Sequence, residues 1–302
     1  MRTEIISAKK NLPLFFSPAL ILIVLFVLFP VLQTIYISFF SSSGEFVGLD
    51  NYNDVLTSKE ILNLGDVSQG LSQPYGLGAL VHNMLWILIH LPLSMFSGLA
   101  LAIILRDVKG ASVVKSAIFL GMVTPMIVGG LILQFTFEEG VGIVNGFFNI
   151  LGLEQLTRTW TAHPETALFA VIFGSVWLWT GFSLIVYSAG LATIPREYYE
   201  AAKIDGTTPF RTFFRITFPL LKPMTLVVIT MTLLWELKIF DIVWAAVGEG
   251  GGPGQASNVL ALQMYVWAFR SFDFNRAAAV ATILTALTLV VSVWMIRYMV
   301  KK

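Results

Sequence analysis

Three ionisable residues lie inside a long apolar stretch, and they are the positions where this chain could do chemistry. Glu236, Lys238 and Asp241 all fall within residues 224–247. A charge inside a membrane costs about 2.5–3.5 kcal/mol on insertion scales, so such residues usually serve a function. Lys238 and Asp241 are spaced to pair on one helix face, whereas Glu236 lies on another face and needs its own partner. The sequence therefore predicts an intramembrane Lys238–Asp241 ion pair, with either a structural role or a role in lining a path for a polar solute.

No catalytic or metal-binding constellation accompanies these charges. The chain has no cysteine, and its three histidines (His82, His90 and His163) show no metal-ligand spacing. The dipeptide Gly-Lys never occurs, so a Walker-type phosphate loop is excluded, and neither GxSxG nor HExxH is present. We therefore predict no catalytic residue, no metal and no cofactor in this chain. It should bind and move a solute while a partner supplies the energy.

The elements that position these residues are transmembrane helices. Apolar residues make up 56% of the 302, and charged residues 12%, which excludes a soluble enzyme, a disordered chain and a nucleic-acid binder. Continuously apolar runs of about 20 residues favour helices over barrel strands. The predicted fold is an all-α polytopic membrane protein with one domain over residues 1–302. Its six predicted spans are at about 12–40, 80–105, 116–137, 166–194, 224–247 and 276–299.

The distribution of lysine and arginine predicts the orientation in the membrane. Of the 19 basic residues, 14 fall in the two termini and the second and fourth connections, and 4 fall in the other three connections. Basic residues concentrate on the cytoplasmic side of a cell membrane. We therefore expect both termini, and the long connection 195–223, to be cytoplasmic.

The connection 195–223 has the pattern of two short helices. Pro195 can open the first helix, Asp205-Gly206 can end it, and Thr208 can cap a second one that begins at Pro209. Phe210, Phe213 and Phe214 share one face of that second helix. From the residues alone, an amphipathic segment lying on the membrane surface is an equally good interpretation.

The same connection resembles the EAA signature of binding-protein-dependent ABC importer permeases. The matching residues are Glu200-Ala201-Ala202, Gly206, Ile216 and Phe218-Pro219, with Phe218 where leucine is usual. Outside the connection, the chain is similar to sugar-uptake permeases of the maltose and glycerol-phosphate type, and to the first of their two permease subunits. The segments that carry this similarity are Phe16-Ser17-Pro18, Phe29-Pro30, Val47 to Tyr52, Trp235 to Asp241 and Gly251 to Gly254.

The resemblance implies a type I importer fold of the MetI-like kind and a set of partners. These are a second permease subunit forming a heterodimer, two cytoplasmic ATPases that bind ATP and Mg, and an external binding protein that delivers a sugar. The connection would be the coupling helix that docks on the ATPase. In that role Glu200 would anchor the ATPase, Ala201 and Ala202 would allow close approach, Asp205 and Gly206 would make the turn, and Pro219 would set the exit.

The family's sugar site lies in mid-membrane on the fourth and fifth spans, and this implies a substrate path here. Aromatic faces stack on sugar rings, and polar groups bind the hydroxyls. The residues of these types at helical spacing are Ser175, Trp179 and Phe182 on one span, and Thr232, Trp235 and Glu236 on the other. Ordinary helix packing is the alternative for each. Weaker candidates are Asn83, Gln134, Tyr187 and Gln263.

A second function remains open at this point. An ion-coupled secondary transporter could use Glu236, Lys238 and Asp241 to couple ions to a polar solute. Such transporters often carry interrupted helices in corresponding halves of the chain, and we find no such pattern in this sequence. The importer interpretation and the ion-coupled one differ most clearly in the role of Glu200 to Gly206.

Overall fold

The computed structural model describes residues 15–64 and 67–300, and this part of the chain consists of helices and connecting loops. Four helices are long and apolar enough to cross a membrane, and two bent helix pairs bring the number to as many as six. The four are Phe15–Ile37, Ala79–Ile104 (α4), Pro164–Thr193 (α8) and Phe274–Tyr298 within α15 (Phe274–Val300). They match four of the predicted spans, although residues 12–14 of the first prediction lie outside the described residues.

The third predicted span, 116–137, is not one helix. It consists of α5 (Ala111–Val123) and α6 (Met126–Thr136), which are bent by 100° relative to one another. Pro125 precedes α6, and Thr124 takes an extended conformation with ψ 128°. A proline disfavours helical geometry in the residue before it, which explains the break.

The fifth predicted span, 224–247, is also broken. Helix α12 (Lys222–Leu237) ends at Lys238, and α13 (Asp241–Val247) begins after Phe240, whose φ of −144° is not helical. Neither glycine nor proline lies between the two helices. A side chain from α4, described below, donates a hydrogen bond to a backbone carbonyl at the end of α12.

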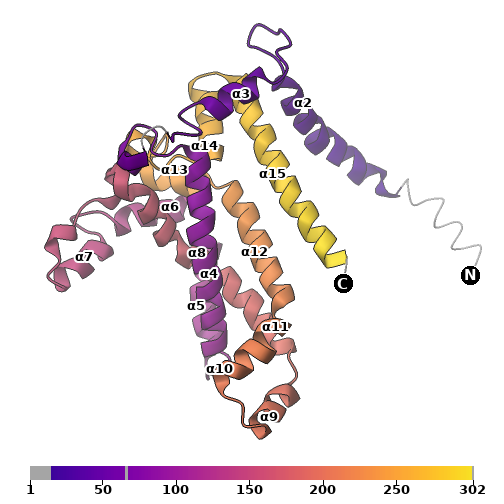
Figure 1. The fold of residues 1–302 in the computed structure, drawn as a ribbon, viewed down its shortest axis with the longest axis vertical. Helices are drawn as coiled ribbons and strands as arrows, with labels where there is room; N and C mark the ends of the chain where they lie inside the picture. The colour runs from indigo at the N-terminus through magenta and orange to yellow at the C-terminus, as the bar shows by residue number, and fades with distance from the viewer. Residues whose placement is uncertain (1–14, 65–66, 301–302) are drawn as a thin grey trace, which may run out of the picture.

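Helix α8 lies at the centre of the bundle. Its sequence is apolar on all sides, which is typical of a helix with neighbours all around it, and 56% of its most apolar window is buried. Helices α4 and α5 pack along it, while α6 packs on α13 (Figure 1). The approach of α4 to α8 is close enough that a Cβ on Gly98 would lie 2.3 Å from the Cβ of Ser183.

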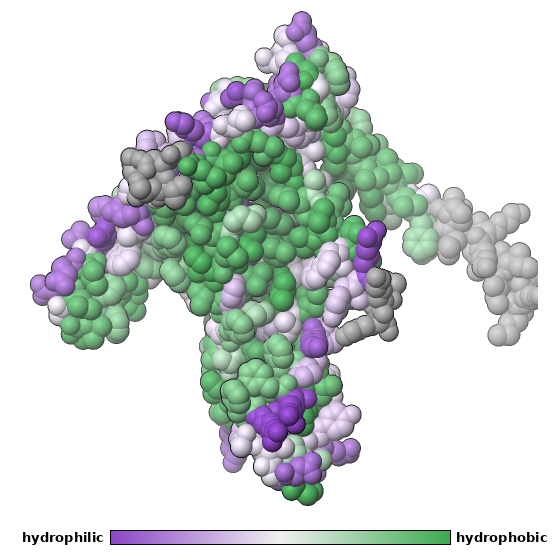
Figure 2. Space-filling model, viewed as in Figure 1, coloured by the Kyte–Doolittle hydropathy of each residue, from purple (hydrophilic) through white to green (hydrophobic). Residues whose placement is uncertain are grey.

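Helix α15 packs against α12 and α14 at the edge of this bundle, and the N-terminal helix lies outside it (Figure 1). The N-terminal helix includes a π-helical turn, η1 (Val24–Leu28), and α2 (Phe29–Ile37), and α2 packs against α15. None of the most apolar window of Phe15–Ile37 is buried within the chain. Figure 2 shows hydrophobic residues across the middle of the molecule and hydrophilic ones gathered towards its two ends. That distribution fits a chain surrounded by lipid and other apolar partners.

Short helices occupy the two ends of the bundle. One end carries α3 and α14, the opposite end carries α9, α10 and α11, and α7 projects to the side (Figure 1). The short elements are α3 (Asp50–Thr57), η2 (Val67–Ser72), α7 (Ile143–Ile150), η3 (Glu154–Leu156), η4 (Trp160–Ala162), α9 (Arg196–Ile204), α10 (Pro209–Thr212), η5 (Phe213–Thr217), α11 (Phe218–Leu220), η6 (Pro253–Gln255), α14 (Leu260–Tyr265) and η7 (Val266–Arg270).

Candidate functional site

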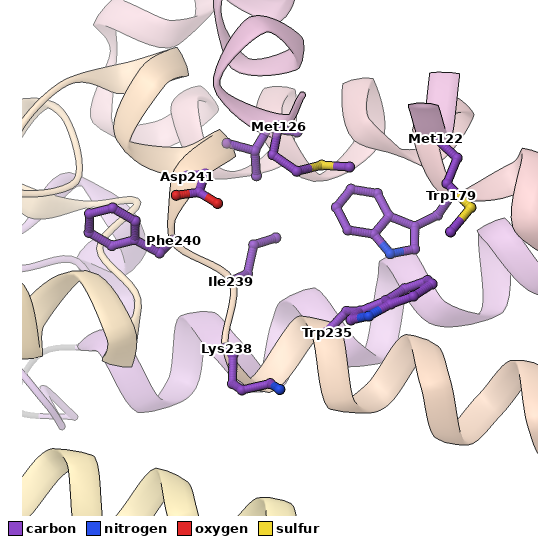
Figure 3. A pocket seen from close by; sticks show the side chains of 9 residues that line it. Met122, Met126, Trp179, Trp235, Lys238, Ile239, Phe240 and Asp241 are labelled. Carbon is purple, nitrogen blue, oxygen red and sulfur yellow. The ribbon is translucent and has the colours of Figure 1, made fainter. Parts of the chain in front are cut away.

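A cavity of about 260 Å³ lies beside the break between α12 and α13. Tryptophan and methionine side chains line one part of it, and the irregular segment 238–240 lines another (Figure 3). The lining residues are Met122, Met126, Trp179, Trp235, Lys238, Ile239, Phe240, Asp241 and Ile242. Irregular backbone at membrane depth is tolerated only where protein or a water-filled cavity surrounds it, and it often marks a binding site.

Two of the predicted substrate-path residues form an aromatic wall of this cavity. The ring centroids of Trp179 and Trp235 are 6.4 Å apart, and Phe182 meets Trp235 edge-on at 5.0 Å. Trp179 comes from α8 and Trp235 from α12, so the wall brings together the two predicted spans. The arrangement offers aromatic faces of the kind that a ring-shaped polar solute can stack on.

The predicted Lys238–Asp241 ion pair is not formed. The pairing assumed that the helix continues from residue 238 to residue 241, but the chain leaves the helix between them. Figure 3 shows the two side chains on separate parts of the cavity wall, with the segment from Ile239 to Phe240 between them. Both are exposed, and within the described part of the chain neither takes part in an ion pair. They give the cavity one cationic and one anionic side chain.

Glu236 does not line the cavity. It is fully buried, and its Oε1 lies 2.6 Å from Nδ1 of His90 on α4. The His90 ring in turn meets Trp179 edge-on at 5.0 Å. The partner that Glu236 needed is therefore a histidine that sequence reasoning set aside for want of metal-ligand spacing. The available signal was that His90 is itself a polar residue in a predicted span.

The weaker candidate Asn83 supports the helix break. Its Nδ2 donates to the backbone carbonyl of Glu236 at 3.0 Å, and its Oδ1 accepts from the backbone N–H of Leu260 at 2.8 Å. Asn83 thus connects α4 to the end of α12 and to the start of α14. The Glu236 carbonyl also accepts from the backbone N–H of Ile239 at 3.3 Å. The α4 side chain and this local turn together satisfy the carbonyl where α12 ends without a glycine or proline.

Ser175 and Thr232 are buried away from the cavity. Ser175 is fully buried, and its Oγ donates to the carbonyl of Ile172 at 2.9 Å. Thr232 is 1% exposed. Of the six predicted residues, Trp179 and Trp235 line the cavity, Phe182 packs against Trp235, and Ser175, Thr232 and Glu236 lie in the helix contacts around them. The lining residues Met122 and Met126 were not anticipated.

The broken helices also correct an expectation from the sequence. The sequence shows no pattern of broken helices in corresponding halves of the chain, whereas the structure has helix breaks at residues 124–125 and 238–240. The half-helices that follow the two breaks, α6 and α13, pack against each other. Pro125 was a visible signal for the first break, whereas the second is contacted by Asn83, which is distant in sequence.

At the opposite end of the bundle, the connection 195–223 folds as its sequence predicts. Helix α9 runs Arg196–Ile204, and Gly206 follows it with a φ of 68°, which glycine adopts without strain. The N–H of Thr207 donates to the carbonyl of Ala202 at 3.0 Å and closes the helix end. Thr208 caps α10, because its Oγ1 accepts from the N–H of Arg211 at 3.4 Å.

The outward side of this connection exposes apolar groups together with Glu200. Ile204 is 86% exposed, Phe210 75% and Tyr198 49%. Ala202, in contrast, is buried against its own chain, so only Ala201 of the two alanines lies on the outside. Large apolar side chains exposed beyond the ends of the long helices are typical of a protein-docking surface.

Comparison with known proteins identifies the family. Residues 90–302 match the family model described as "binding-protein-dependent transport system inner membrane component". A probable ABC transporter permease protein of Pyrococcus horikoshii is 56% identical over 293 residues, which cover 96% of this chain and 99% of that protein. The alpha-glucoside transport system permease protein AglF of Rhizobium meliloti is 32% identical over 292 residues, covering 94% of this chain and 81% of AglF.

A solved structure agrees at the level of the fold. It is the crystal structure of a bacterial ABC transporter involved in the import of the acidic polysaccharide alginate. The match has a TM-score of 0.77 and 18% identity, and it covers 97% of this chain and 96% of the compared chain. The fold is therefore that of an ABC importer permease, and neither it nor the relatives support ion-coupled transport. The chain belongs to the binding-protein-dependent transport system inner membrane component family, the membrane permease subunits of ABC transporters, whose ATPase is a separate subunit.

Proposed function

We propose that this permease subunit forms part of the path by which a sugar or related polyol crosses the cell membrane into the cytoplasm. The observation that carries the proposal is the cavity at the α12–α13 break, with Trp179 and Trp235 as its wall. Among the relatives, AglF is named for alpha-glucoside transport and MalF of Thermococcus litoralis, 30% identical over 278 residues, for trehalose/maltose transport. A mono-, di- or oligosaccharide and a glycerol-phosphate-like solute all fit an aromatic wall flanked by one cation and one anion.

The proposed assembly contains a second permease, two ATPases and an external binding protein. The exposed apolar side of α9 and α10 supports an ATPase contact at the connection 195–223. Glu200 and Ala201 lie on that side, while Asp205 and Gly206 form the turn that presents it, and Pro219 begins the return. With this end in the cytoplasm, both termini would be cytoplasmic as well. A compared structure is of the alginate transporter in complex with a substrate-bound periplasmic protein, so a partner of that kind is consistent with the fold.

The arrangement suggests how ATPase movement reaches the cavity. Helix α8 leads directly into α9, and α12 follows α11, so the connection joins the two helices that carry Trp179 and Trp235. A rigid-body displacement of the connection would move both helices and change the separation of the two walls. That is a hinge-type alternating-access step, in which the ATPases supply the energy.

Uptake by the assembled transporter in proteoliposomes, with ATP enclosed, tests the solute path. Trp179→Ala and Trp235→Ala should raise the KM for the sugar by about 10-fold each, since aromatic contacts are worth about 0.5–1.5 kcal/mol beyond the area that they bury. Trp294→Ala removes an exposed tryptophan from α15 and is the matched control. Unchanged KM in both cavity variants would refute the assignment of the wall.

Co-purification tests the docking surface. Glu200→Lys and Gly206→Pro should lose the ATPase while keeping the second permease, because they alter the exposed connection and leave the bundle intact. Lys109→Glu, on a different exposed connection at the same end, is the control for a change of charge. If both variants retain the ATPase and wild-type uptake, the coupling role of the connection is wrong.

A further inference from the structure

A second cavity, of about 320 Å³, lies between the ends of α4 and α8 and the start of α5, at the same end as α9. Its wall is mostly polar. Arg106 follows α4, Lys115 is on α5, and Arg196 is the first residue of α9. The remaining lining residues are Ala102, Asp107, Ser188, Leu191, Ala192 and Ile194. This cavity shares no lining residue with the one at the helix break.

The charges around this cavity are not balanced. Three cationic side chains face one carboxylate, that of Asp107. In the described residues, none of the three cations is in an ion pair with any carboxylate, Asp107 included. The guanidinium of Arg106 instead lies over the ring of Tyr199 on α9, 4.3 Å from its centroid, which holds it at the cavity. Uncompensated cations gathered around a hollow favour an anionic ligand.

Two further features indicate what kind of anion fits. The Oγ of Ser188 is buried without a hydrogen-bond partner, so it can donate to a ligand oxygen in the cavity. Arginine presents its N–H donors as a planar fork that matches phosphate oxygens. Leu191, Ile194 and Ala102 add apolar surface next to the polar groups. The chemistry is that of an oxyanion attached to, or adjacent to, an apolar group.

We propose that this cavity binds a phosphate group. Its source is either the headgroup of an anionic phospholipid or a free phosphoanion. Basic pockets between helix ends on the cytoplasmic side of a membrane are suited to lipid headgroups, which carry the phosphate at this depth. The site joins the α4–α5 connection to the start of α9 through Arg106 and Arg196. A bound phosphate therefore stabilises the first turn of α9 against the bundle.

Native mass spectrometry of the assembled transporter tests the site without any transport assay. The complex is reconstituted in nanodiscs of phosphatidylcholine mixed with phosphatidylglycerol, extracted in mild detergent, and examined for retained phosphatidylglycerol. Each cation near a lipid surface is worth about 1 kcal/mol, so Lys115→Gln should reduce retention by about 5-fold and the pair Arg106→Gln, Lys115→Gln by about 30-fold. Lys109→Gln is the control, because Lys109 lies with Arg106 in the connection between α4 and α5 but does not line the cavity.

The second arm adds inorganic phosphate to the detergent-extracted complex. In one outcome, millimolar phosphate displaces phosphatidylglycerol from the wild-type complex and has no such effect on the Lys115→Gln variant. That result identifies the phosphate group as the part of the lipid that the cavity recognises. It also identifies a free phosphoanion as a sufficient source. Retention that resists phosphate but needs Lys115 identifies the lipid as the source. Equal retention of phosphatidylcholine, or an equal loss in the Lys109→Gln control, overturns the proposal. Thermal unfolding of each variant is measured alongside, so that a folding defect from moving Arg106 off Tyr199 is recognised.

Discussion

Two regions of the proposed transport mechanism, the connection 195–223 and the helix break at 238–240, are stabilised in opposite ways. The connection 195–223 is folded by its own residues: a glycine turn, a threonine cap and hydrogen bonds between near neighbours, with large apolar groups left exposed. The break at 238–240 is held by side chains more than 140 residues away along the chain, since His90 and Asn83 contact Glu236 from α4. We therefore expect the first region to keep its shape when it moves. We expect the second to change shape when α4 and α12 move relative to one another.

A pair of glycine substitutions tests this difference with the largest expected effect. Gly98→Ala places a Cβ 2.3 Å from the Ser183 Cβ and 2.7 Å from the backbone nitrogen of Leu184, so α4 and α8 must separate. We expect a loss of about 3 kcal/mol in unfolding free energy, the upper end for overpacking, because backbone cannot move aside as a side chain can. Gly206→Ala has open space around its Cβ but a φ of 68°, and should cost only about 1 kcal/mol.

Denaturant unfolding of the purified complex measures the two changes. Gly206→Ala should keep the folded bundle and lower the rate of coupled uptake, whereas Gly98→Ala should reduce the amount of folded protein. Equal losses of stability in the two variants would show that the two regions do not differ as described.

The next prediction concerns Asn83. Asn83→Leu leaves the N–H of Leu260 without a partner and removes one of the donors to the Glu236 carbonyl, which keeps the N–H of Ile239 at 3.3 Å. A buried donor left unsatisfied costs about 1–3 kcal/mol, so we expect about 2 kcal/mol of destabilisation. Hydrogen exchange should also speed up at the Leu260 amide. Asn149→Leu, at an exposed position on α7, is the matched control and should change stability by less than about 0.5 kcal/mol. Wild-type exchange at Leu260 would refute the role of Asn83.

The features that could be predicted from the sequence are those stabilised by local contacts, as in the connection 195–223. Apolar runs of sufficient length located the four long helices, and Pro195, Gly206 and Thr208 placed the ends of the short ones, because each signal acts on its own neighbours. The wall of the cavity was predicted in part, since Trp179 and Trp235 are of a type and spacing that suit it.

The rest of the site could not be found this way. No glycine or proline marks the break after α12, and the hydrogen bond that Asn83 makes there comes from another helix. Assuming a continuous helix from residue 224 to 247 then made Lys238 and Asp241 look like an i, i+3 pair, and it hid the fact that Glu236 faces His90. The interruption at residues 238–240 thus accounts for the ion pair that the structure does not form.

A double-mutant cycle measures the His90–Glu236 contact. His90→Leu and Glu236→Leu should each destabilise the protein by leaving a buried polar partner alone, and the double variant should cost less than their sum by about 1.5 kcal/mol. The Ser97–Thr180 pair, at 2.7 Å between α4 and α8, is the control: this partly buried contact between two hydroxyls should show a coupling of only about 0.6 kcal/mol. Additive effects at His90 and Glu236 would mean that the contact does not hold the break.

The smallest expected effect lies in the connection itself. Thr208→Ala removes the oxygen that accepts from the Arg211 N–H, and because the bond is long at 3.4 Å we expect about 0.5 kcal/mol, the low end for an N-cap. The loss should stay local: hydrogen exchange should increase at residues 209–217, while the amides of α8 and α12 keep their wild-type protection. Thr208→Ser retains the acceptor and should restore the wild-type pattern. If Thr208→Ala instead loosened the amides around Leu260, the connection and the helix break would form one cooperative unit, and the independence of the two regions would be lost.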